Sequence, residues 1–357
     1  MKVFGKRHLK VILWYVFFWL FAIYFLILIR FIGHAGMIFN PVAPEAPIDI
    51  SVFWRMGLVG ALLMGIAFGF LEILFEKRIF RVMGYGKLIL VKSVIYVFIF
   101  VLILAYLSLR NLHLSFGYID FYTWRASFFD LNLLIPVSYM AVAGIILNFI
   151  KEISLKFGQG ILWKMLIGKF HRPKEEERIL MFLDLRSSTT IAEKLGHIKY
   201  SELIQDCFND LSIVRKQDAE IYQYVGDEAV LSWTVKSGLD NNNCLHAFYA
   251  FKDVLQQRTK HYQKKYGLTP FFKAGMNMGK VTVAEVGQIK KEIAFHGDTV
   301  NTAARIQGKC NELDSELLIS ESLEKQVNGT HFKREIMGRV ALKGKQKEIN
   351  IYAVTRP

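Results

Sequence analysis

The stretch from Val11 to Ile29 contains 19 consecutive apolar residues. A helix needs about 20 such residues to cross the hydrocarbon core of a bilayer, so this run predicts a membrane span. A secretory signal peptide fits it less well, because the run is longer than the usual apolar core and no cleavage site of small residues follows it. Later apolar stretches complete a predicted bundle of four spans: Val11–Ile29, Val52–Phe75, Leu88 or Ser93 to Leu109, and Leu131–Ile150.

The basic residues predict how the spans are oriented. They gather before the first span, after the second and after the fourth: Lys2, Lys6, Arg7, Lys10, Lys77, Arg78, Arg81, Lys87, Lys151, Lys156, Lys164 and Lys169. The segments on the opposite side carry little beyond Arg30, Arg110 and Arg125. The positive-inside rule therefore places both termini in the cytoplasm. We expect a multi-pass integral protein of a bacterial inner membrane.

The formal net charge of +14 has an explanation in this topology. Basic residues next to membrane spans contact anionic lipid headgroups, so membrane lipid is the expected partner of the positive charge. Nucleic acid, the other common partner of a basic chain, is not expected.

Small and charged residues mark the second span. Ala61, Gly65 and Gly69 recur at four-residue spacing, which lets two helix backbones approach closely, either inside one bundle or between two copies. Arg55 and Glu72 lie near its ends. We interpret both charges as side chains that extend to the membrane surface.

The sequence after the fourth span divides into two further regions. Residues 151–174 place apolar side chains among lysines at helical spacing, at Ile153, Phe157, Ile161, Leu162, Met165 and Leu166. This pattern predicts an amphipathic linker that lies on the membrane surface or couples two protomers. The predicted domains are therefore a four-helix membrane domain at 1–150, the linker at 151–174 and a soluble domain at 175–357.

The soluble domain alternates between strand and helix periods. Strands are predicted at 178–185, in the hairpin "AEIYQYV" and "AVLSW", and in a second strand pair, "FFKAGMNMG" and "KVTVAEVG". Helices are predicted at 188–195, 200–216, 242–265 and 298–310. The order strand, helix, hairpin, helix, strand predicts a ferredoxin-like α+β fold, with one face of the sheet left for a ligand or partner.

Two carboxylates and one helix carry the candidate chemistry. Asp184 ends a predicted strand and Asp227 sits on the hairpin tip. Such a pair suits Mg²⁺, although aspartates at strand ends also form ordinary turns. In "HGDTVNTAARIQ", Asn301 and Arg305 are four residues apart and share a helix face. Arginine supplies a permanent planar charge for phosphate oxygens, and asparagine supplies hydrogen bonds to a sugar or water.

Five motifs in one order give the domain a family resemblance. They are "FLDLRSST", "YVGDE", "GMNMGKVTVAEVG", "GDTVNTAARI" and "GRVALKGKQKEINIYAV". Residues 176–356 resemble the catalytic domain of class III adenylate or guanylate cyclases. The resemblance implies conversion of ATP, with GTP as the alternative, to a cyclic monophosphate and pyrophosphate.

The resemblance also implies residue roles. Asp184, Asp227 and the Leu185 carbonyl would bind two Mg²⁺ or Mn²⁺ ions. The catalytic residues would be Asn301 at the ribose, Arg305 at the α-phosphate and Lys343 at the β- and γ-phosphates. The remaining substrate-binding positions would be Phe182, Gln223 and Ala294. In the family, metal aspartates and the Asn/Arg helix come from different chains, so a homodimer is the expected active form.

Some residues depart from the family pattern. The base-reading positions usually hold Lys or Glu where this chain has Gln223, and Asp, Thr or Cys where it has Ala294. We predict an adenylate cyclase, with a guanylate cyclase or a catalytically silent nucleotide-binding receptor as alternatives. A diguanylate cyclase is disfavoured, because the Asn301/Arg305 helix is foreign to it. We further hypothesise that the spans and the linker set the distance or rotation between two catalytic domains.

Overall fold

The computed structural model describes residues 6–37, 50–75, 85–116, 121–129, 133–157, 163, 165, 167–329, 331–340 and 348–356. Its contacts divide the chain into two compact units, Met1–Lys156 and Phe157–Pro357. Each unit has an apolar core of its own.

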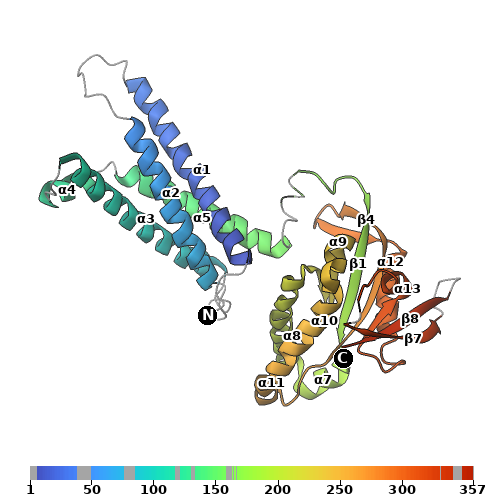
Figure 1. The fold of residues 1–357 in the computed structure, drawn as a ribbon. Coiled ribbons are helices and arrows are strands. Elements are labelled where there is room, and N and C mark those ends of the chain that lie inside the picture. The colour runs from blue at the N-terminus through green and yellow to red at the C-terminus, as the bar shows by residue number, and fades with distance from the viewer. Residues whose placement is uncertain are drawn as a thin grey trace. The chain divides into compact units, whose positions relative to one another are not determined.

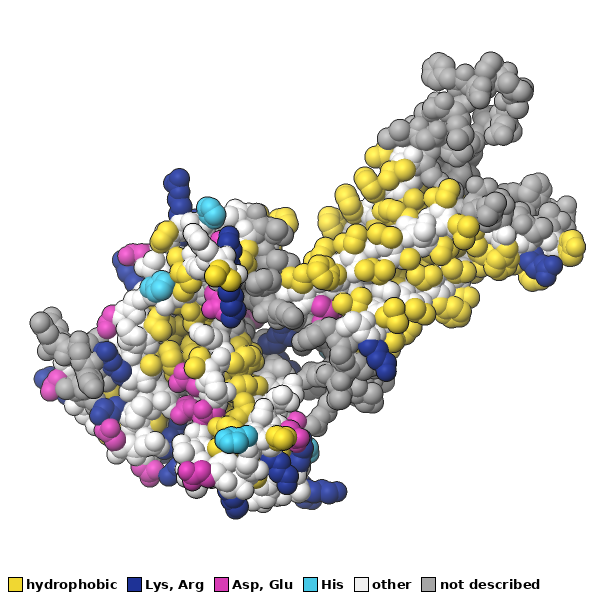
Figure 2. Space-filling view, turned by 180° about the vertical axis from the view of Figure 1, so that it is seen from behind, with side chains coloured by type: hydrophobic (Ala, Val, Ile, Leu, Met, Phe, Trp, Pro, Cys, Tyr) yellow, Lys and Arg dark blue, Asp and Glu magenta, His cyan; other side chains and the backbone are white. Residues whose placement is uncertain are grey.

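The first unit is helical (Figure 1). Its elements are α1 (Lys6–Met37), α2 (Ile50–Phe75), α3 (Tyr85–Phe116), α4 (Phe121–Phe128) and α5 (Leu134–Phe157). Four contain stretches that are long and apolar enough to cross a membrane: His8–Ile29, Trp54–Phe75, Gly86–Arg110 and Leu134–Ser154. Hydrophobic side chains cover the visible face of this unit (Figure 2). The four predicted spans are confirmed as helices of this kind, which indicates a membrane-anchored chain.

The small-residue stripe of α2 packs against α1 of the same chain. A Cβ atom added to Gly65 would lie 2.4 Å from the Cα of Val16, and one added to Gly69 would lie 2.8 Å from the Cα of Ile12. Any side chain at these positions would therefore collide with the α1 backbone. Of the two interpretations of the stripe, the structure favours packing within one bundle.

A network of charged and phenolic side chains crosses the core of the helical unit. We call it the polar clasp and define it as Tyr15, Glu72, Lys92, Tyr96, Lys151 and Glu152. Glu72 lies at its centre, with its Oε1 atom 3.1 Å from the Lys92 Nζ and 2.5 Å from the Lys151 Nζ. The hydroxyl groups of Tyr15 and Tyr96 donate to Oε2 at 2.9 and 3.3 Å. The clasp thus joins all four long helices.

The expectation that Glu72 extends to the membrane surface is wrong. Glu72 and Lys92 are each only 3% exposed. A carboxylate buried among apolar helices is tolerable only when cations and hydrogen-bond donors surround it, and α1, α3 and α5 supply them here. Arg55, in contrast, is exposed.

The end of α5 differs from the predicted linker boundary. The helix continues without a break to Phe157, so residues 151–157 extend the fourth long helix. Lys151 and Glu152 belong to the polar clasp and therefore face the bundle. Of the remaining linker positions, Ile161, Leu162 and Leu166 lie outside the described residues.

The second unit is built on a mixed sheet. Its strands are β1 (Lys174–Leu185), β2 (Glu220–Val225), β3 (Glu228–Thr234), β4 (Phe272–Val286), β5 (Glu292–His296), β6 (Leu317–Ser320), β7 (Lys333–Val340) and β8 (Ile349–Thr355). They lie in the order β2-β3-β1-β4-β6-β8-β7, and β5 pairs with β4. The portion β2-β3-β1-β4 is antiparallel throughout and has the strand order of the predicted ferredoxin-like plan.

Helices occupy the connections between these strands. They are α7 (Ser188–Leu195), α8 (His197–Leu211), η3 (Ser212–Gln217), α9 (Val235–Leu239), η4 (Asp240–Asn242), α10 (Asn243–Gln257), α11 (Thr259–Tyr266), α12 (Asp298–Gly308) and α13 (Glu321–Glu324). The helix predicted at 242–265 is interrupted at Arg258, whose φ of −97° and ψ of 12° are not helical.

The predicted second strand pair is wrong. Residues 272–286 form one strand, β4, and Gly279 does not break it because it pairs in register with Arg178 of β1. The partner of the outer part of β4 is β5, which pairs with residues 282–286.

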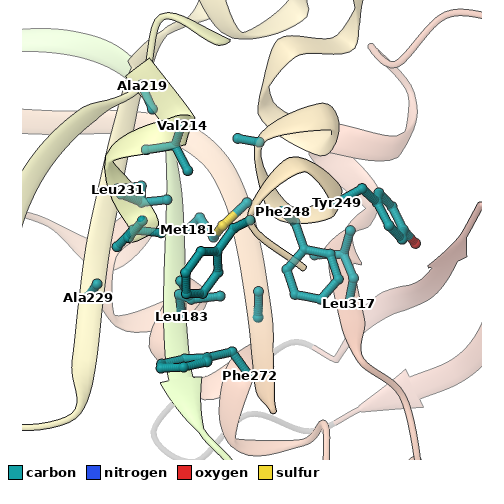
Figure 3. Packing of buried hydrophobic residues seen from close by; sticks show 14 of the residues in the cluster. Met181, Leu183, Val214, Ala219, Ala229, Leu231, Phe248, Tyr249, Phe272 and Leu317 are labelled. Atoms are coloured by element: carbon teal, nitrogen blue, oxygen red, sulfur yellow. The ribbon is translucent and has the colours of Figure 1, made fainter. Parts of the chain in front are cut away.

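The sheet buries different residues on its two faces. Met181 and Leu183 of β1 face α8 and α10 and share a cluster with Leu231 and Phe248 (Figure 3). Leu180 and Phe182 point the other way, into a cluster with Val230, Val281, Val283, Ala303 and Phe170. Because Ala303 belongs to α12, this second side is called the α12 face below. Successive strand residues alternate between faces, so Asp184 is also on the α12 face.

Candidate active site

The two candidate metal-binding aspartates come from neighbouring strands. Asp184 is the penultimate residue of β1, and Asp227 follows Gly226 in the two-residue turn between β2 and β3. Gly226 has a φ of +61°, which glycine adopts without steric cost. Asp184 lies opposite Glu228 in the β1/β3 register, so these two side chains share the α12 face. The fold thus gathers three acidic residues at one end of two strands.

Burial and neighbouring negative charge raise the pKa values of Asp184 and Glu228. Burial and then the negative charge of Asp227 raise the pKa of Asp184 to about 6. Burial and then the charges of Asp184 and Asp227 raise the pKa of Glu228 to about 7. Carboxylates normally have pKa values near 4. The raised values therefore mean that the folded protein disfavours the ionised forms of Asp184 and Glu228. A divalent cation would relieve this repulsion.

The described residues contain no group of three or more His, Cys, Asp or Glu side chains arranged to hold a metal ion. A metal at Asp184 and Asp227 would therefore depend on two carboxylates together with other oxygen ligands. Mg²⁺ in nucleotide enzymes is usually held in this way, by one or two carboxylates plus substrate phosphates. The residues present therefore fit such an ion.

α12 packs directly over β1 and β4 beside the aspartates. A Cβ atom added to Gly275 of β4 would lie 2.1 Å from the backbone nitrogen of Gln307, so only glycine permits this approach. The amide of Gln307 then donates to Asp184, with 3.3 Å between Nε2 and Oδ2. On the other side, burial and then the charge of Asp227 raise the pKa of Tyr200 on α8 to about 12.

The candidate catalytic pair on α12 lies outside the residues that pack against the sheet. Thr302, Ala303 and Ile306 are buried against the sheet, whereas Asn301 is exposed and Arg305 is half-buried. Within the described part of the chain, Arg305 forms no ion pair, and neither Asn301 nor Arg305 is bonded to Asp184 or Asp227. Asn301 thus lies on the exposed side of α12, and Arg305 lies at the margin between this side and the packed face.

The remaining predicted site residues lie in different surroundings. Phe182 and Leu185 are buried in β1, at 8% and 1% exposure. Gln223 on β2 is exposed, and Ala294 on β5 is half-buried and pairs with Ala284 of β4. Lys343 lies outside the described residues.

Three neighbours of the aspartates were missed by sequence reasoning. Glu228 was detectable, since it follows Asp227 and begins a strand that pairs with the one ending near Asp184. Tyr200 and Gln307 carried no local signal, because their proximity depends on how α8 and α12 pack on the sheet.

Comparison with known families assigns this domain. Residues 171–356 match the family model described as the adenylate and guanylate cyclase catalytic domain. The chain belongs to this family. The match covers the whole described sheet from β1 to β8, and the predicted family is confirmed.

Related proteins of this cyclase family are found among bacteria. Adenylate cyclase 2 of Rhizobium meliloti (strain 1021) is 30% identical over 228 residues, which cover 63% of this chain and 62% of the relative. Adenylate cyclase 1 of the same strain is 26% identical over 185 residues, covering 50% of this chain and 27% of the relative. The chain therefore spans about three fifths of the first relative and about a quarter of the second.

A solved structure shares the fold. A bacterial light-regulated adenylyl cyclase matches with a TM-score of 0.53 at 20% identity, over 64% of this chain and 66% of that chain. At this identity the match establishes the cyclase-type fold, in agreement with the predicted α+β domain.

The raised pKa values predict a pH-dependent response to metal. Because the folded-state pKa values of Asp184 and Glu228 lie above their ordinary values, these groups destabilise the metal-free fold progressively as the pH rises from about 4 to about 7. Metal competes with protons for these oxygens. We therefore expect Mn²⁺ at about 100 times its Kd to add about 2.7 kcal/mol of stability at pH 8. The addition should be much smaller at pH 5.5.

Thermal unfolding of the detergent-solubilised chain, with and without Mn²⁺ at both pH values, measures this difference. The Asp184→Asn variant is the control, because it lacks the carboxylate and should lose most of the Mn²⁺ response at either pH. An equal increase in Tm at pH 5.5 and pH 8 for the unmodified chain would contradict the assignment.

Proposed function

We propose that this protein is a membrane-bound adenylate cyclase that converts ATP to 3',5'-cyclic AMP and pyrophosphate. In the reaction the ribose 3'-oxygen forms a bond to the α-phosphorus, and the bond from that phosphorus to the β-bridging oxygen breaks. Pyrophosphate leaves and the 3'-hydroxyl proton is released. The observation that carries the proposal is the position of Asp184 and Glu228 beside Asp227 in a cyclase-family fold, where burial and then the neighbouring negative charges raise the pKa values of Asp184 and Glu228.

The aspartates would hold the ions that the reaction requires. Two Mg²⁺ or Mn²⁺ ions, when bound, would lower the pKa of the attacking hydroxyl and neutralise the departing phosphates. Asp184 and Asp227 would supply the carboxylate ligands, with the Leu185 carbonyl as a further ligand. Gln307 would keep Asp184 oriented through its 3.3 Å hydrogen bond.

The α12 pair supports a site shared by two copies of the chain. Asn301 is exposed and Arg305 is half-buried on α12, and no described interaction links them to the aspartates of their own chain. In a homodimer, α12 of one protomer could present them to the aspartates of the other. Arg305 would then stabilise charge that develops on the α-phosphate, and Asn301 would orient the ribose. Lys343 would hold the β- and γ-phosphates.

Adenine is the proposed base. Two of the relatives described above are adenylate cyclases by name. The Gln223 amide can donate and accept, and so can pair with adenine, whereas Ala294 offers the base no polar side chain. Phe182 would line the substrate site from β1. Because a glutamine amide can also rotate to suit guanine, GTP is the second candidate substrate.

The membrane unit would anchor the enzyme at the inner face of a bacterial inner membrane. The basic residues around the four spans support a cytoplasmic N-terminus and a cytoplasmic catalytic unit by the positive-inside rule. There the catalytic unit would have access to nucleotide. The linker and the four helices would set how two catalytic units meet, which is how a signal in the membrane could reach the active site.

Product formation tests the proposal. The purified full-length protein in nanodiscs with Mn²⁺ is supplied with ATP or GTP, and cyclic AMP and cyclic GMP are quantified. We expect cyclic AMP from ATP at a higher kcat/KM than cyclic GMP from GTP. The reverse preference would make the protein a guanylate cyclase. Nucleotide binding with neither product would favour the catalytically silent receptor.

A further inference from the structure

Strand β2 contains an irregularity directly before Gln223. Ile221 pairs with Leu231 of β3 and Gln223 pairs with Val230, so Tyr222 between them has no partner in the ladder. This is a β-bulge, in which two residues of one strand face one residue of its neighbour. Bulges of this kind change the direction in which the following side chains point.

The bulge decides which face of the sheet Gln223 occupies. In an unbroken ladder Gln223 would lie opposite Ala229, which belongs to the cluster packed against α8 and α10. With the bulge it lies opposite Val230, which belongs to the α12 face. Residues directly opposite each other point to the same side. Gln223 is therefore turned toward the face that carries Asp184.

Tyr222 contacts β5 through both its ring and its hydroxyl group. Its ring stacks on the Phe295 ring with a centroid distance of 4.3 Å and an interplanar angle of 5°. Its hydroxyl oxygen accepts a hydrogen bond from the backbone N–H of Phe295 at 3.0 Å. Phe295 follows Ala294, so one pair of rings links the strand of Gln223 to the strand of Ala294.

A buried arginine adds to this contact between β2 and β5. Arg178 of β1 is 3% exposed, and its guanidinium lies 5.5 Å from the centre of the Phe295 ring. It also forms an ion pair with Glu220 of β2 at 2.8 Å. The Arg178 guanidinium thus contacts Phe295 of β5 and Glu220 of β2. Because Arg178 is buried, solvent does not screen its interaction with the Phe295 ring.

We propose that Tyr222 and Phe295 are positioning residues that stabilise the β2 bulge. The bulge fixes the direction of the Gln223 side chain, and this direction determines which purine base is preferred. This inference rests on the proposed function, because it assigns Gln223 to base recognition. Neither ring needs to touch the nucleotide. Their effect passes through the backbone of β2 and β5.

The variants Tyr222→Phe and Phe295→Leu test whether the contact between these two residues positions Gln223. The first removes only the hydroxyl that accepts from the Phe295 N–H, and the second removes the stacked ring. We expect the ratio of kcat/KM for ATP to kcat/KM for GTP to move toward one, by about fivefold for Tyr222→Phe and about tenfold for Phe295→Leu. The change should appear mainly in KM, because base contacts bind ground state and transition state alike.

Tyr224→Phe is the matched control. Tyr224 is on the same strand, but its ring packs against Phe208 of α8 at a centroid distance of 4.5 Å and an interplanar angle of 30°, and no described ring contact or hydrogen bond joins it to β5. Its loss of a hydroxyl should leave the ATP-to-GTP ratio unchanged. A general loss of folding would lower both activities together and so leave the ratio unchanged as well.

An unaltered ratio in both test variants, with Tm close to that of the unmodified protein, would overturn the inference. If the unmodified protein forms no cyclic product, the proposed function fails separately. The inference is then decided by the Kd values of fluorescent ATP and GTP analogues for the unmodified, Tyr222→Phe and Tyr224→Phe proteins. A Kd ratio that shifts only in Tyr222→Phe supports it, and an unchanged ratio overturns it.

Discussion

Replacing Asp227 by alanine should reduce cyclic AMP formation by about 1,000-fold or more. The reason is that Asp227 is one of only two aspartates proposed to hold the ions, and Asp184 alone cannot keep them beside the triphosphate. The measurement is kcat/KM for ATP with Mn²⁺, for the full-length protein in nanodiscs. Raising the Mn²⁺ concentration should recover only part of the loss.

The folded state should tolerate this change. Asp227 contributes to the unfavourable charge that raises the pKa values of Asp184 and Glu228, so its removal should leave the Tm of the metal-free protein at pH 8 unchanged or higher. Glu193→Ala is the matched control, since Glu193 is an exposed carboxylate on the nearby helix α7. It should keep normal activity. Retention of more than about a tenth of the activity in Asp227→Ala would contradict the metal assignment.

The sequence predicted those parts of the site that depend on local patterns. A continuous apolar run located β1, and two short apolar segments around Gly226 located the β2/β3 hairpin, which placed Asp184 at a strand end and Asp227 at the hairpin tip. Helical spacing put Asn301 and Arg305 on one side of α12. These features are decided by neighbours within a few residues, so they can be read without knowing the fold.

Features that depend on distant packing were not predicted. The hydrogen bond between Gln307 and Asp184 joins residues 123 positions apart. It forms only because the α12 backbone packs closely against Gly275. The polar clasp required knowledge of which sides of four helices face each other, and a lone Glu72 in the sequence gave no indication of its partners. The continuity of β4 through Gly279 follows from pairing with β1, which outweighs the weak strand preference of glycine.

The polar clasp and the group formed by Asp184, Asp227 and Glu228 both contain poorly solvated carboxylates. They differ in whether the surrounding residues compensate the negative charge. Glu72 is surrounded by Lys92, Lys151 and two tyrosine hydroxyls, so its charge is compensated within the chain. Asp184 receives hydrogen bonds from the Gln307 amide and the Leu185 backbone but pairs with no cation among the described residues, and it lies near the acids Asp227 and Glu228. A compensated carboxylate holds structure together, whereas an uncompensated one is available for a cation.

A mixed dimer of two inactive variants should regain about half of the activity of the unmodified dimer. The variants are Asp184→Asn, which loses the metal ligand, and Arg305→Ala, which loses the charge for the α-phosphate and should lower kcat by about 100- to 1,000-fold. If each site takes its aspartates from one chain and its α12 pair from the other, such a dimer contains one fully damaged site and one intact site. Co-expression with two different tags and sequential affinity purification yields this dimer for assay.

The decisive control pairs two variants of the same half of the site. A dimer of Asp184→Asn with Asp227→Ala has one metal ligand missing from each site, so it should remain inactive. Recovery in this control would mean that contaminating enzyme is present or that the two aspartates of one site come from different chains. A purified Asp184→Asn/Arg305→Ala dimer that stays as inactive as its parents would show that each site uses residues of a single chain. We expect recovery because Asn301 is exposed, Arg305 is half-buried, and no described interaction joins either residue to the aspartates of its own chain.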